Sequence, residues 1–539
     1  MREHHEVPSS DAVVGHRRDE SGLEVVGDGR ADAPSGRGVA ALLAAIACTV
    51  FGSRLIVIAA FGSPVPLLDQ WDGEGALLYS PYLKGTLSFA GLFASHNGHR
   101  ILVTRLLALG HLELAGEWNT RLEMIVGAVV LTAVVTWLAA LLMPLVARDR
   151  QLLLSCFVAI VFAFPIDYEN TVWGFQSQVY LSLLFGLAAL TAVASAAPFS
   201  PRWFAGLGAG VLAYFTFATG VAALLAAGSL VSLQLVTNVR KRCAREVIAV
   251  MTIALIAVGL TLWGAESTTT MSNLWTFLGG LGIFAALTFA AIVPIVLYCR
   301  RTLARRPRIG DRAWVILGIS AWLAIQLALF AVGRGIHVAP RYMDVVLLAY
   351  VVALVAVLDL SDQAPSEVVG GKVRLRARTW VIPVFVVMTV VGCASVLACN
   401  FWSRAAGQQL TDVRAYLATG DVEHLTELGG PTHGIVLRHP YPERQARALD
   451  DPALRAVLPR EIRPSDADNS GARDRMVLRG TLAGASATAV QISFLLAPGV
   501  LALGLAILIG VGRAQRLSPG DSRQRLRRDR GFVPPYRRG

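Results

Sequence analysis

The stretch that decides the fold is the apolar run GVAALLAAIACTVFGSRLIVIAA at residues 38–60, together with the polar segment that follows it directly. The run is long enough to cross a bilayer as a helix, which takes about 20 residues. Similar runs recur to the end of the chain, and 54% of its 539 residues are hydrophobic whereas 16% are charged. A typical soluble protein carries about 25% charged residues. The sequence therefore predicts an all-α, polytopic transmembrane helical bundle, because backbone groups in lipid must be paired within each helix.

The apolar runs predict twelve spans. These are residues 38–60, 122–147, 151–166, 178–197, 203–218, 221–238, 246–264, 275–299, 313–332, 342–360, 380–399 and 488–512. Two of them are separated at Ala218-Thr219-Gly220, because one continuous span would place the arginines of 240–245 outside the membrane, whereas basic loops normally lie inside. Residues 101–116 are apolar but interrupted by charged residues, which predicts an amphipathic helix at the outer interface.

Basic residues in the short loops predict the orientation. With the N-terminus inside, the inner loops hold the arginines of 148–150, 240–245, 300–312 and 374–378, whereas outer loops 167–177 and 265–274 contain no Lys or Arg. This pattern predicts a multi-pass membrane protein with both termini in the cytoplasm. The net charge of +12 is then explained by topology and attraction to the anionic lipid bilayer, not by binding of nucleic acid.

The spans divide the chain into five predicted parts. They are a disordered cytoplasmic tail (1–37), a transmembrane domain (38–399) with an outer first loop (61–121), an extracytoplasmic segment (400–487), a last transmembrane helix (488–512) and a basic cytoplasmic tail (513–539). Segment 400–487 would bind an acceptor, cap a cavity or serve as a partly ordered spacer. The six cysteines show no paired spacing, so no disulfide framework is predicted.

Three carboxylates follow the first span within six residues: Asp69, Asp72 and Glu74. Mutual repulsion in a partly dry site should raise the pKa of at least one of them toward neutrality, as a general base requires. The competing interpretation is a solvated turn, since Asp and Gly favour turns.

The same loop ends in His96-Asn97-Gly98-His99-Arg100. His96 and His99 could ligate a divalent metal together with Asp72 or Glu74, and this is the one cofactor that the pattern allows. Otherwise the histidines donate hydrogen bonds to substrate or to loop carboxylates. Arg100 is expected either to form an ion pair with one of the acids of this loop or to bind substrate.

A second polar patch lies between two spans, at residues 167–178. Glu169, Asn170, Gln176 and Trp173 are the candidate residues, because polar groups near the membrane are costly unless they line a cavity. Amides and a carboxylate beside an aromatic face also suit a sugar. The alternative for Trp173 is an ordinary interfacial aromatic.

The third patch, residues 334–344, breaks the basic-inside rule with two arginines. Arg334 and Arg341 suit a phosphate, because guanidinium groups bind phosphate through charge-assisted, bidentate hydrogen bonds. His337 and Tyr342 complete the candidate site. The alternatives are contact of the arginines with lipid headgroups, or an ion pair from Arg341 to Asp344.

Two of these motifs resemble the GT-C superfamily of polytopic glycosyltransferases, which includes protein mannosyltransferase-like and lipid A aminoarabinose transferase-like members. The motifs are Trp71-Asp72-Gly73-Glu74 after the first helix and Pro340-Arg341-Tyr342 at the start of a late helix. The resemblance implies that Asp72, with Asp69 second, acts as base, and that Arg341 and Tyr342 lie near a lipid phosphate. The chain departs from the pattern in that Gly73 separates two acids that are adjacent in many relatives. It also lacks a lysine in the turn 216–220.

The resemblance implies inverting transfer of a sugar from a polyprenyl-phosphate donor to a hydroxyl of a glycan, lipid or protein acceptor, on the outer face of a bacterial plasma membrane. His96, His99, Glu169, Asn170 and Gln176 would hold sugar hydroxyls. The alternative is a multi-pass transporter or a lipid-linked-glycan flippase without transferase activity. A carrier would need ionisable residues in the middle of several spans, and the predicted spans are nearly bare of them.

Overall fold

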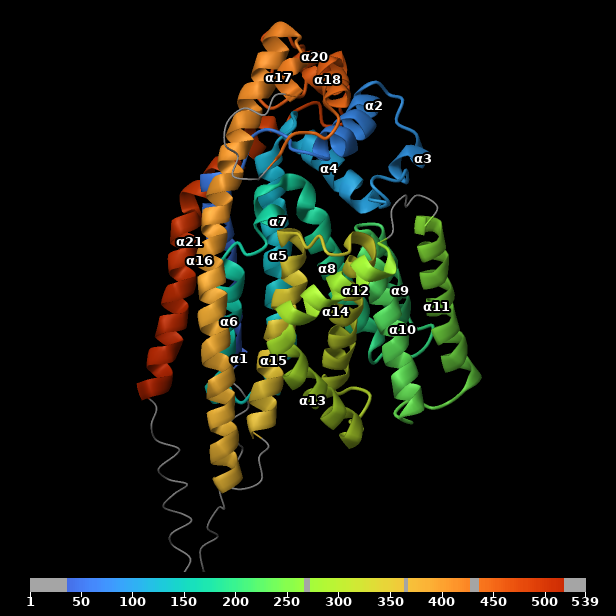
Figure 1. Ribbon diagram of the computed structural model, residues 1–539, viewed down its shortest axis with the longest axis vertical. Helices are drawn as coiled ribbons and strands as arrows, with labels where there is room; N and C mark the ends of the chain where they lie inside the picture. Colours follow the sequence, from blue (N-terminus) through green and yellow to red (C-terminus); the bar gives the residue numbers. More distant parts are fainter. Residues whose placement is uncertain (1–35, 266–271, 363–366, 427–435, 518–539) are drawn as a thin grey trace, which may run out of the picture.

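The computed structural model describes residues 36–265, 272–362, 367–426 and 436–517. Within these ranges every element is helical, and backbone hydrogen bonds of 2.8 Å in both directions between His96 and His99 form an isolated bridge. Long helices stand side by side, and the short helices of the first loop and of segment 400–487 gather at one end of the bundle (Figure 1). We call this the cavity end. The predicted all-α class is confirmed.

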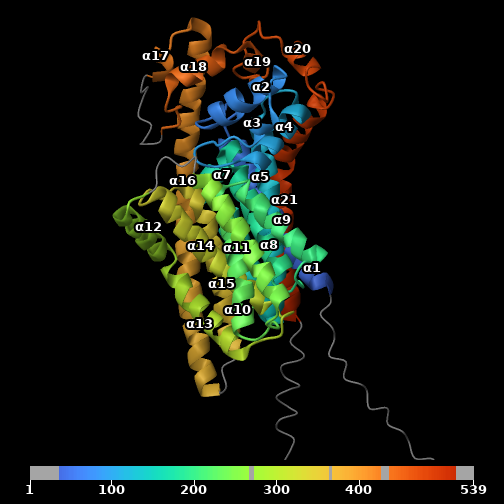
Figure 2. The same ribbon diagram turned by 90° about the vertical axis from the view of Figure 1, so that its right-hand side faces the viewer.

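Among the described residues, nine helices are long and apolar enough to cross a membrane. They cover Arg37–Phe61, Thr120–Leu145, Gly174–Val193, Ala218–Val236, Ala244–Ala265, Ala313–Arg334, Pro340–Asp362, Ala377–Thr419 and Ala483–Arg516. A tenth span is reached if α12 (Leu274–Leu287) and α13 (Phe289–Arg305), which are bent by 81° at Thr288, count as one. Figure 2 shows α12 set off from the rest of the bundle. The chain is a multi-pass membrane protein with nine to ten spans in these ranges.

The prediction of twelve spans is therefore wrong. Helix α6 (Arg148–Ala163) has 16 residues and α9 (Pro201–Tyr214) has 14, which gives lengths of about 24 and 21 Å, short of the ~30 Å of hydrocarbon. Helix α6 ends early because Pro165 holds the preceding Phe164 in an extended conformation, at φ −75° and ψ 139°. Both helices still alternate in direction with their neighbours, so the cavity end receives the same loops that the sequence assigns to one side.

The remaining helices of the bundle are α1 Gly36–Phe61, α5 Thr120–Leu142, α8 Ser177–Val193, α10 Val221–Val236, α11 Ala244–Ala265, α14 Ala313–Arg334, α15 Met343–Asp362, α16 Glu367–Thr419 and α21 Ala483–Leu517.

Helix α1 approaches α21 closely at two glycines. A side chain at Gly52 would come within 2.5 Å of the backbone nitrogen of Leu501, and one at Gly504 would meet Thr49. Small residues of this kind allow membrane helices to pack backbone to backbone.

Helix α16 corrects two predicted boundaries. It begins at Glu367, so the basic residues of 372–378 lie on a helix and not in a loop. It also continues past residue 399 to Thr419, so the predicted span 380–399 and the start of segment 400–487 are one helix. The long helix carries the chain out of the bundle at the cavity end (Figure 1).

The first loop and the C-terminal segment form one layer with a shared hydrophobic core. The layer contains a π-helix, η1 (Trp71–Tyr79), with α2 (Ser80–Leu83), α3 (Phe89–Leu92), α4 (Leu102–Ala115), α17 (Glu423–Thr426), α18 (Pro442–Asp450), α19 (Pro452–Arg455) and α20 (Asn469–Asp474). Trp118 packs edge-on against Trp71 and Tyr79, and the same buried cluster includes Leu449 and Leu454. Because both segments contribute to one core, segment 400–487 is packed onto the first loop.

Helix α4 is the predicted amphipathic helix, and it is not among the spanning helices. The buried Arg105 donates three hydrogen bonds to the carbonyls of Gly91, Leu92 and Ala94, at 2.6–3.1 Å. These bonds fix the turn that precedes the two histidines.

Candidate functional site

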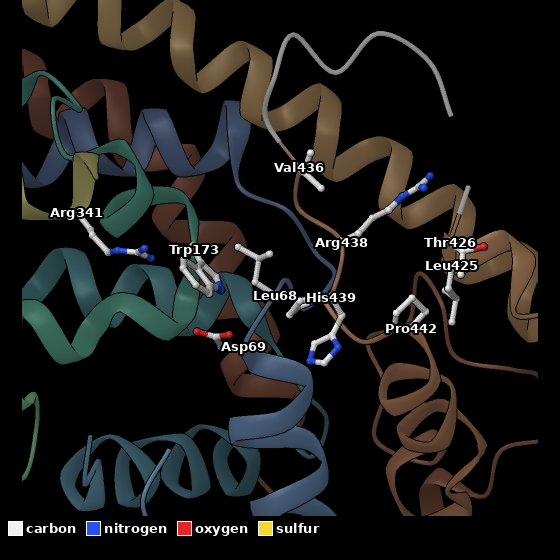
Figure 3. Close-up of a pocket in the computed structure, with 11 residues that line it drawn as sticks. Leu68, Asp69, Trp173, Arg341, Leu425, Thr426, Val436, Arg438, His439 and Pro442 are labelled. Carbon is white, nitrogen blue, oxygen red and sulfur yellow. The ribbon is translucent and has the colours of Figure 1, made fainter. Parts of the chain in front are cut away.

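A cavity of about 530 Å³ opens at the cavity end between the first loop, the loop after α6 and the C-terminal segment (Figure 3). It is lined by Leu68, Asp69, Trp173, Arg341, Leu425, Thr426, Val436, Arg438, His439, Pro440 and Pro442. Each of the three polar patches contributes one of these residues: Asp69, Trp173 and Arg341. Residues more than 270 positions apart in the chain therefore meet at one hollow.

The first of these residues, Asp69, is placed by a strained turn. Leu68 has φ 49°, in the left-handed region that costs a branched residue about 1–3 kcal/mol and that clusters at functional sites. The π-helix η1 begins three residues after Leu68, and π-helical turns also concentrate at such sites. Within the part of the chain that the structure describes, the carboxylate of Asp69 has no hydrogen-bond or ion-pair partner. Figure 3 shows it beside Trp173, on the same side of the cavity as Arg341.

Asp72, in contrast, is held by the C-terminal segment. The His439 ring Nε2 lies 3.1 Å from its Oδ2, and the Arg444 guanidinium lies 3.6 Å from the same oxygen. The hydrogen bond from His439, aided by the nearby positive charges, lowers the pKa of Asp72 although partial burial opposes the shift. The predicted increase in the pKa of a first-loop carboxyl group is therefore not found at Asp72.

Glu74 has the raised pKa but does not line the cavity. Its side chain is buried, and the Gln70 amide donates to Glu74 at 3.0 Å and to Glu123 at 2.9 Å. Burial raises the pKa of Glu74 to about 7. Its predicted role in substrate binding is not supported by this position, because Glu74 faces the protein interior and belongs to the core beneath η1.

The two histidines connect elements and do not converge on a metal. His99 stacks on Phe217 with ring centroids 4.7 Å apart and accepts a hydrogen bond from the backbone N–H of Ala218 at 3.3 Å. Burial lowers the pKa of His99 to about 3, so its ring is neutral. His96 is buried with its edge toward Phe175. In the described ranges, no group of three His, Cys, Asp or Glu side chains is placed to hold a metal ion, so the divalent-metal alternative finds no ligand set.

Arg100 binds backbone carbonyls and an aromatic ring. It donates to the carbonyls of Phe93 and Trp263, at 3.0 and 3.3 Å, and its guanidinium carbon lies 4.0 Å from the centroid of the Trp263 ring. Of its two alternative roles, pairing with a first-loop carboxylate is not found among the described residues, and Arg100 does not line the cavity either. Arg100 joins the first loop to α11 instead.

Arg341 contacts Glu169 and aromatic faces. Its Nη1 lies 3.5 Å from Oε2 of Glu169, and its guanidinium carbon lies 6.0 Å from the centroid of the Trp173 ring. Burial raises the pKa of Glu169, and the Arg341 charge opposes that rise. The alternative ion pair with Asp344 is not formed. Asp344 is fully buried and accepts a hydrogen bond from Asn170 instead.

Asn170 positions the arginine without lining the cavity itself. Its amide donates to the backbone carbonyl of Arg341 at 2.9 Å and to Asp344 at 2.8 Å. Tyr342 is buried and stacks on Phe330 at 4.3 Å, and Gln176 is also buried. Neither of these two predicted site residues lines the cavity.

Arg334 and His337 are exposed and do not line the cavity either. Arg334 ends α14, and His337 lies in the turn that leads to Pro340. The predicted phosphate site is therefore supported by one arginine of the pair, Arg341.

Sequence reasoning missed two groups of residues. The first is Arg438, which lies 2.7 Å from Asp412, with His439 beside it. The only signal was the run Arg438-His439-Pro440-Tyr441-Pro442 within segment 400–487. The second is Arg54, which lies inside α1 and pairs with Asp167 at 2.5 Å, so the first span is not free of ionisable residues.

No protein family, curated protein or solved structure matches this chain. The cavity therefore has to be interpreted from its own residues. Its polar lining consists of one unpaired carboxylate, two arginines, a histidine, a threonine and an indole.

The His439–Asp72 contact predicts a pH-dependent stability. Burial lowers the pKa of His439, but the hydrogen bonds to Asp72 and to the Tyr441 backbone outweigh it, so the pKa lies above the usual 6.5. The contact therefore stabilises the fold fully just below about pH 6.5, where the ring is protonated and Asp72 is charged. Its contribution is lost as pH rises through the raised pKa of His439. At much lower pH it also weakens, because Asp72 becomes protonated. We expect His439→Gln to lower the free energy of unfolding by about 1–2 kcal/mol near pH 6.

The measurement is the unfolding midpoint of the purified chain and of the variant across a pH series. The difference between them should shrink steadily above the raised pKa of His439. A difference that stays constant with pH would show that His439 acts through packing alone. His337→Gln, an exposed histidine at the same end, is the matched control and should show no effect.

Proposed function

We propose that this chain is an integral-membrane glycosyltransferase that moves a sugar from a polyprenyl-phosphate donor to an acceptor hydroxyl, with inversion at the anomeric carbon. One observation carries the proposal: the carboxylate of Asp69, which has no partner among the described residues, and the guanidinium of Arg341 line the same cavity, at one end of a bundle of membrane-spanning helices. An acid that can take a proton and a cation that can bind phosphate are the two groups that this transfer needs.

Asp69 is the general base in this scheme. It takes the proton of the acceptor hydroxyl while the hydroxyl oxygen forms a bond to the anomeric carbon. The bond from that carbon to the phosphate oxygen breaks, and polyprenyl phosphate leaves with the electron pair. Asp69 suits the role better than Asp72, because His439 and Arg444 already occupy Asp72 and stabilise its charged form. The assignment thus differs from the order that the family resemblance implies.

Arg341 stabilises the leaving phosphate. Glu169 engages one guanidinium nitrogen at 3.5 Å, and the hydrogen bond from Asn170 to the Arg341 carbonyl fixes the backbone at this position. A guanidinium held in this way can supply several kcal/mol to a developing negative charge. The face of Trp173, which also lines the cavity, would stack on the sugar ring.

The membrane placement is part of the proposal. The loops that the sequence assigns to the inner side, such as the one before Arg148, lie at the bundle end opposite the cavity, because α6 begins at Arg148 and ends near the Trp173 loop. With basic residues inside, the cavity opens at the outer face of a bacterial plasma membrane, and both termini are cytoplasmic. The acceptor would be a glycan, lipid or protein outside the cell.

The rival reading is a multi-pass transporter or a lipid-linked-glycan flippase. Arg54 is a fully buried charge inside a span, as a carrier would require, and it corrects the expectation that the spans are nearly bare of ionisable residues. However, Arg54 is held by Asp167, Thr171 and two backbone carbonyls, and it does not line the cavity. A charge fixed on every side favours a structural role over passage of cargo.

The experiment that tests the proposal uses Arg341 variants. We expect Arg341→Gln to slow release of polyprenyl phosphate from a polyprenyl-phosphate sugar by about 10²–10³-fold, because a preorganised donor to the developing charge is lost. Arg341→Lys should recover part of the rate, since the charge remains but the bidentate geometry does not. The matched control is Arg334→Gln, at the exposed arginine nearby. Equal rates for the wild type and Arg341→Gln would refute the role of Arg341.

A further inference from the structure

The cavity has a second, cationic half, and it indicates the chemistry of the acceptor. We propose that the acceptor carries an anionic group, a carboxylate or a phosphate, which binds to Arg438 and His439. This inference rests on the proposed glycosyl transfer, because it assigns the side of the cavity that the donor does not use.

The two halves of the cavity come from different parts of the chain. Asp69, Trp173 and Arg341 belong to the loops that join spanning helices, whereas Thr426, Arg438 and His439 belong to the C-terminal segment. Figure 3 shows Arg341 on one side of the hollow and Arg438 and Thr426 on the other, with His439 between them. A donor anchored in the membrane reaches the first half, so the second half is left for the acceptor.

Two cationic side chains line the second half, and each is paired with an acid that does not line it. Arg438 and His439 line the cavity, whereas Asp412 and Asp72, which pair with them, do not. Arg438 is bound to Asp412 through Nη2 at 2.7 Å, and its Nη1 is buried and has no hydrogen-bond partner among the described residues. A buried, unpaired guanidinium nitrogen at a cavity wall is costly unless a ligand accepts its hydrogen bond.

His439 is the second cationic group of this wall when its ring is protonated. Its Nε2 faces the Asp72 carboxylate at 3.1 Å, and its Nδ1 lies 2.9 Å from the backbone carbonyl of Tyr441 and 3.2 Å from the backbone N–H of the same residue. The nearby Asp72 carboxylate favours the protonated ring. The charge of that ring is then available to an anion.

Arg438 keeps one hydrogen-bond donor for an anion. It binds Asp412 through Nη2 alone, and its Nη1 has no partner among the described residues. A carboxylate or a phosphate on an acceptor would form a charge-assisted hydrogen bond with this nitrogen, whereas a hydroxyl of a neutral glycoside brings no charge.

The test is a binding measurement that needs no donor. The purified full chain in detergent is titrated with glucuronic acid, glucose 6-phosphate and methyl glucoside. We expect at least one of the two anionic probes to bind ten times or more as tightly as the neutral one, and the stronger of the two identifies the anion. Arg438→Gln should reduce the preference to about threefold or less. Asp412→Asn should increase it, because the counter-charge is removed while Arg438 remains.

The matched control is Arg414→Gln, at an arginine of α16 that bonds to the Glu461 carbonyl outside the cavity. It should leave the preference unchanged. The proposal is overturned if the wild type binds all three probes equally, or if Asp412→Asn and Arg438→Gln weaken binding alike, which would indicate general damage. Because no donor is present, a failure of glycosyl transfer leaves this result standing, and a failure here leaves the assignments of Asp69 and Arg341 untouched.

Discussion

Replacement of Asp69 by asparagine is expected to reduce the rate of glycosyl transfer by about 10³-fold or more, because a positioned general base contributes 10²–10⁴-fold. Asparagine has nearly the same size as aspartate but cannot accept a proton at neutral pH. No described side chain bonds to the Asp69 carboxylate, so the variant should insert and unfold as the wild type does. The measurement is turnover of a polyprenyl-phosphate sugar, with the unfolding midpoint as the check of fold.

Asp72→Asn is the matched control for this prediction. It removes a carboxylate three residues away that holds His439 and Arg444. We expect a smaller loss of rate, about tenfold, because a positioning contact is weakened and the base remains. If Asp72→Asn abolishes transfer while Asp69→Asn retains a tenth of the activity or more, the two roles are reversed and the order implied by the family resemblance is restored.

The second large effect concerns stability. Arg54→Met is expected to lower the free energy of unfolding by about 3–5 kcal/mol, because removal of one partner leaves the other charge buried and unpaired. Arg54 and Asp167 are both fully buried at 2.5 Å, and Tyr180 and Thr171 complete the network. The loss can be measured as a lower unfolding midpoint in detergent, with Arg37→Met at the start of α1 as control.

A double variant separates the cost of an unpaired charge from the cost of lost packing. Arg54→Met combined with Asp167→Asn removes both charges and should be more stable than Arg54→Met alone. If the double variant is less stable than the single one by the full effect of Asp167→Asn, the two residues act independently and the network is not a unit. The loop that carries Glu169 and Trp173 begins at Asp167, so activity should follow stability in this series.

The sequence was sufficient for the features that depend on local composition. Apolar runs of bilayer length predicted the spanning helices, and the wrong count came from runs such as 203–218, where helix α9 has only 14 residues. Asp69, Trp173 and Arg341 could be named because each stands in a polar patch beside a span. Arginine placement in the loops then sorted these patches to one side of the bundle.

The rest could not be predicted, because it depends on contacts between distant parts of the chain. The bond between Asp72 and His439 joins residues 367 positions apart. Together with Arg444 it pairs Asp72, whereas Asp69 has no such partner among the described residues. Arg54 stood in an apolar run with no local acid, and its partner Asp167 lies 113 positions away. The buried Glu74 likewise shares the Gln70 amide with Glu123, which lies in another helix.

The most direct test of the central claim is an activity assay in detergent, where no sealed compartment exists and transport cannot be measured. The purified chain in detergent is incubated with a polyprenyl-phosphate sugar and a mixture of glycosides, and free polyprenyl phosphate is measured for the wild type and for Asp69→Asn. We expect the wild type to release polyprenyl phosphate and to glycosylate an acceptor, and the variant to do neither. No release by the wild type, together with movement of the intact lipid-linked sugar between leaflets of sealed vesicles, would contradict the account and identify a carrier.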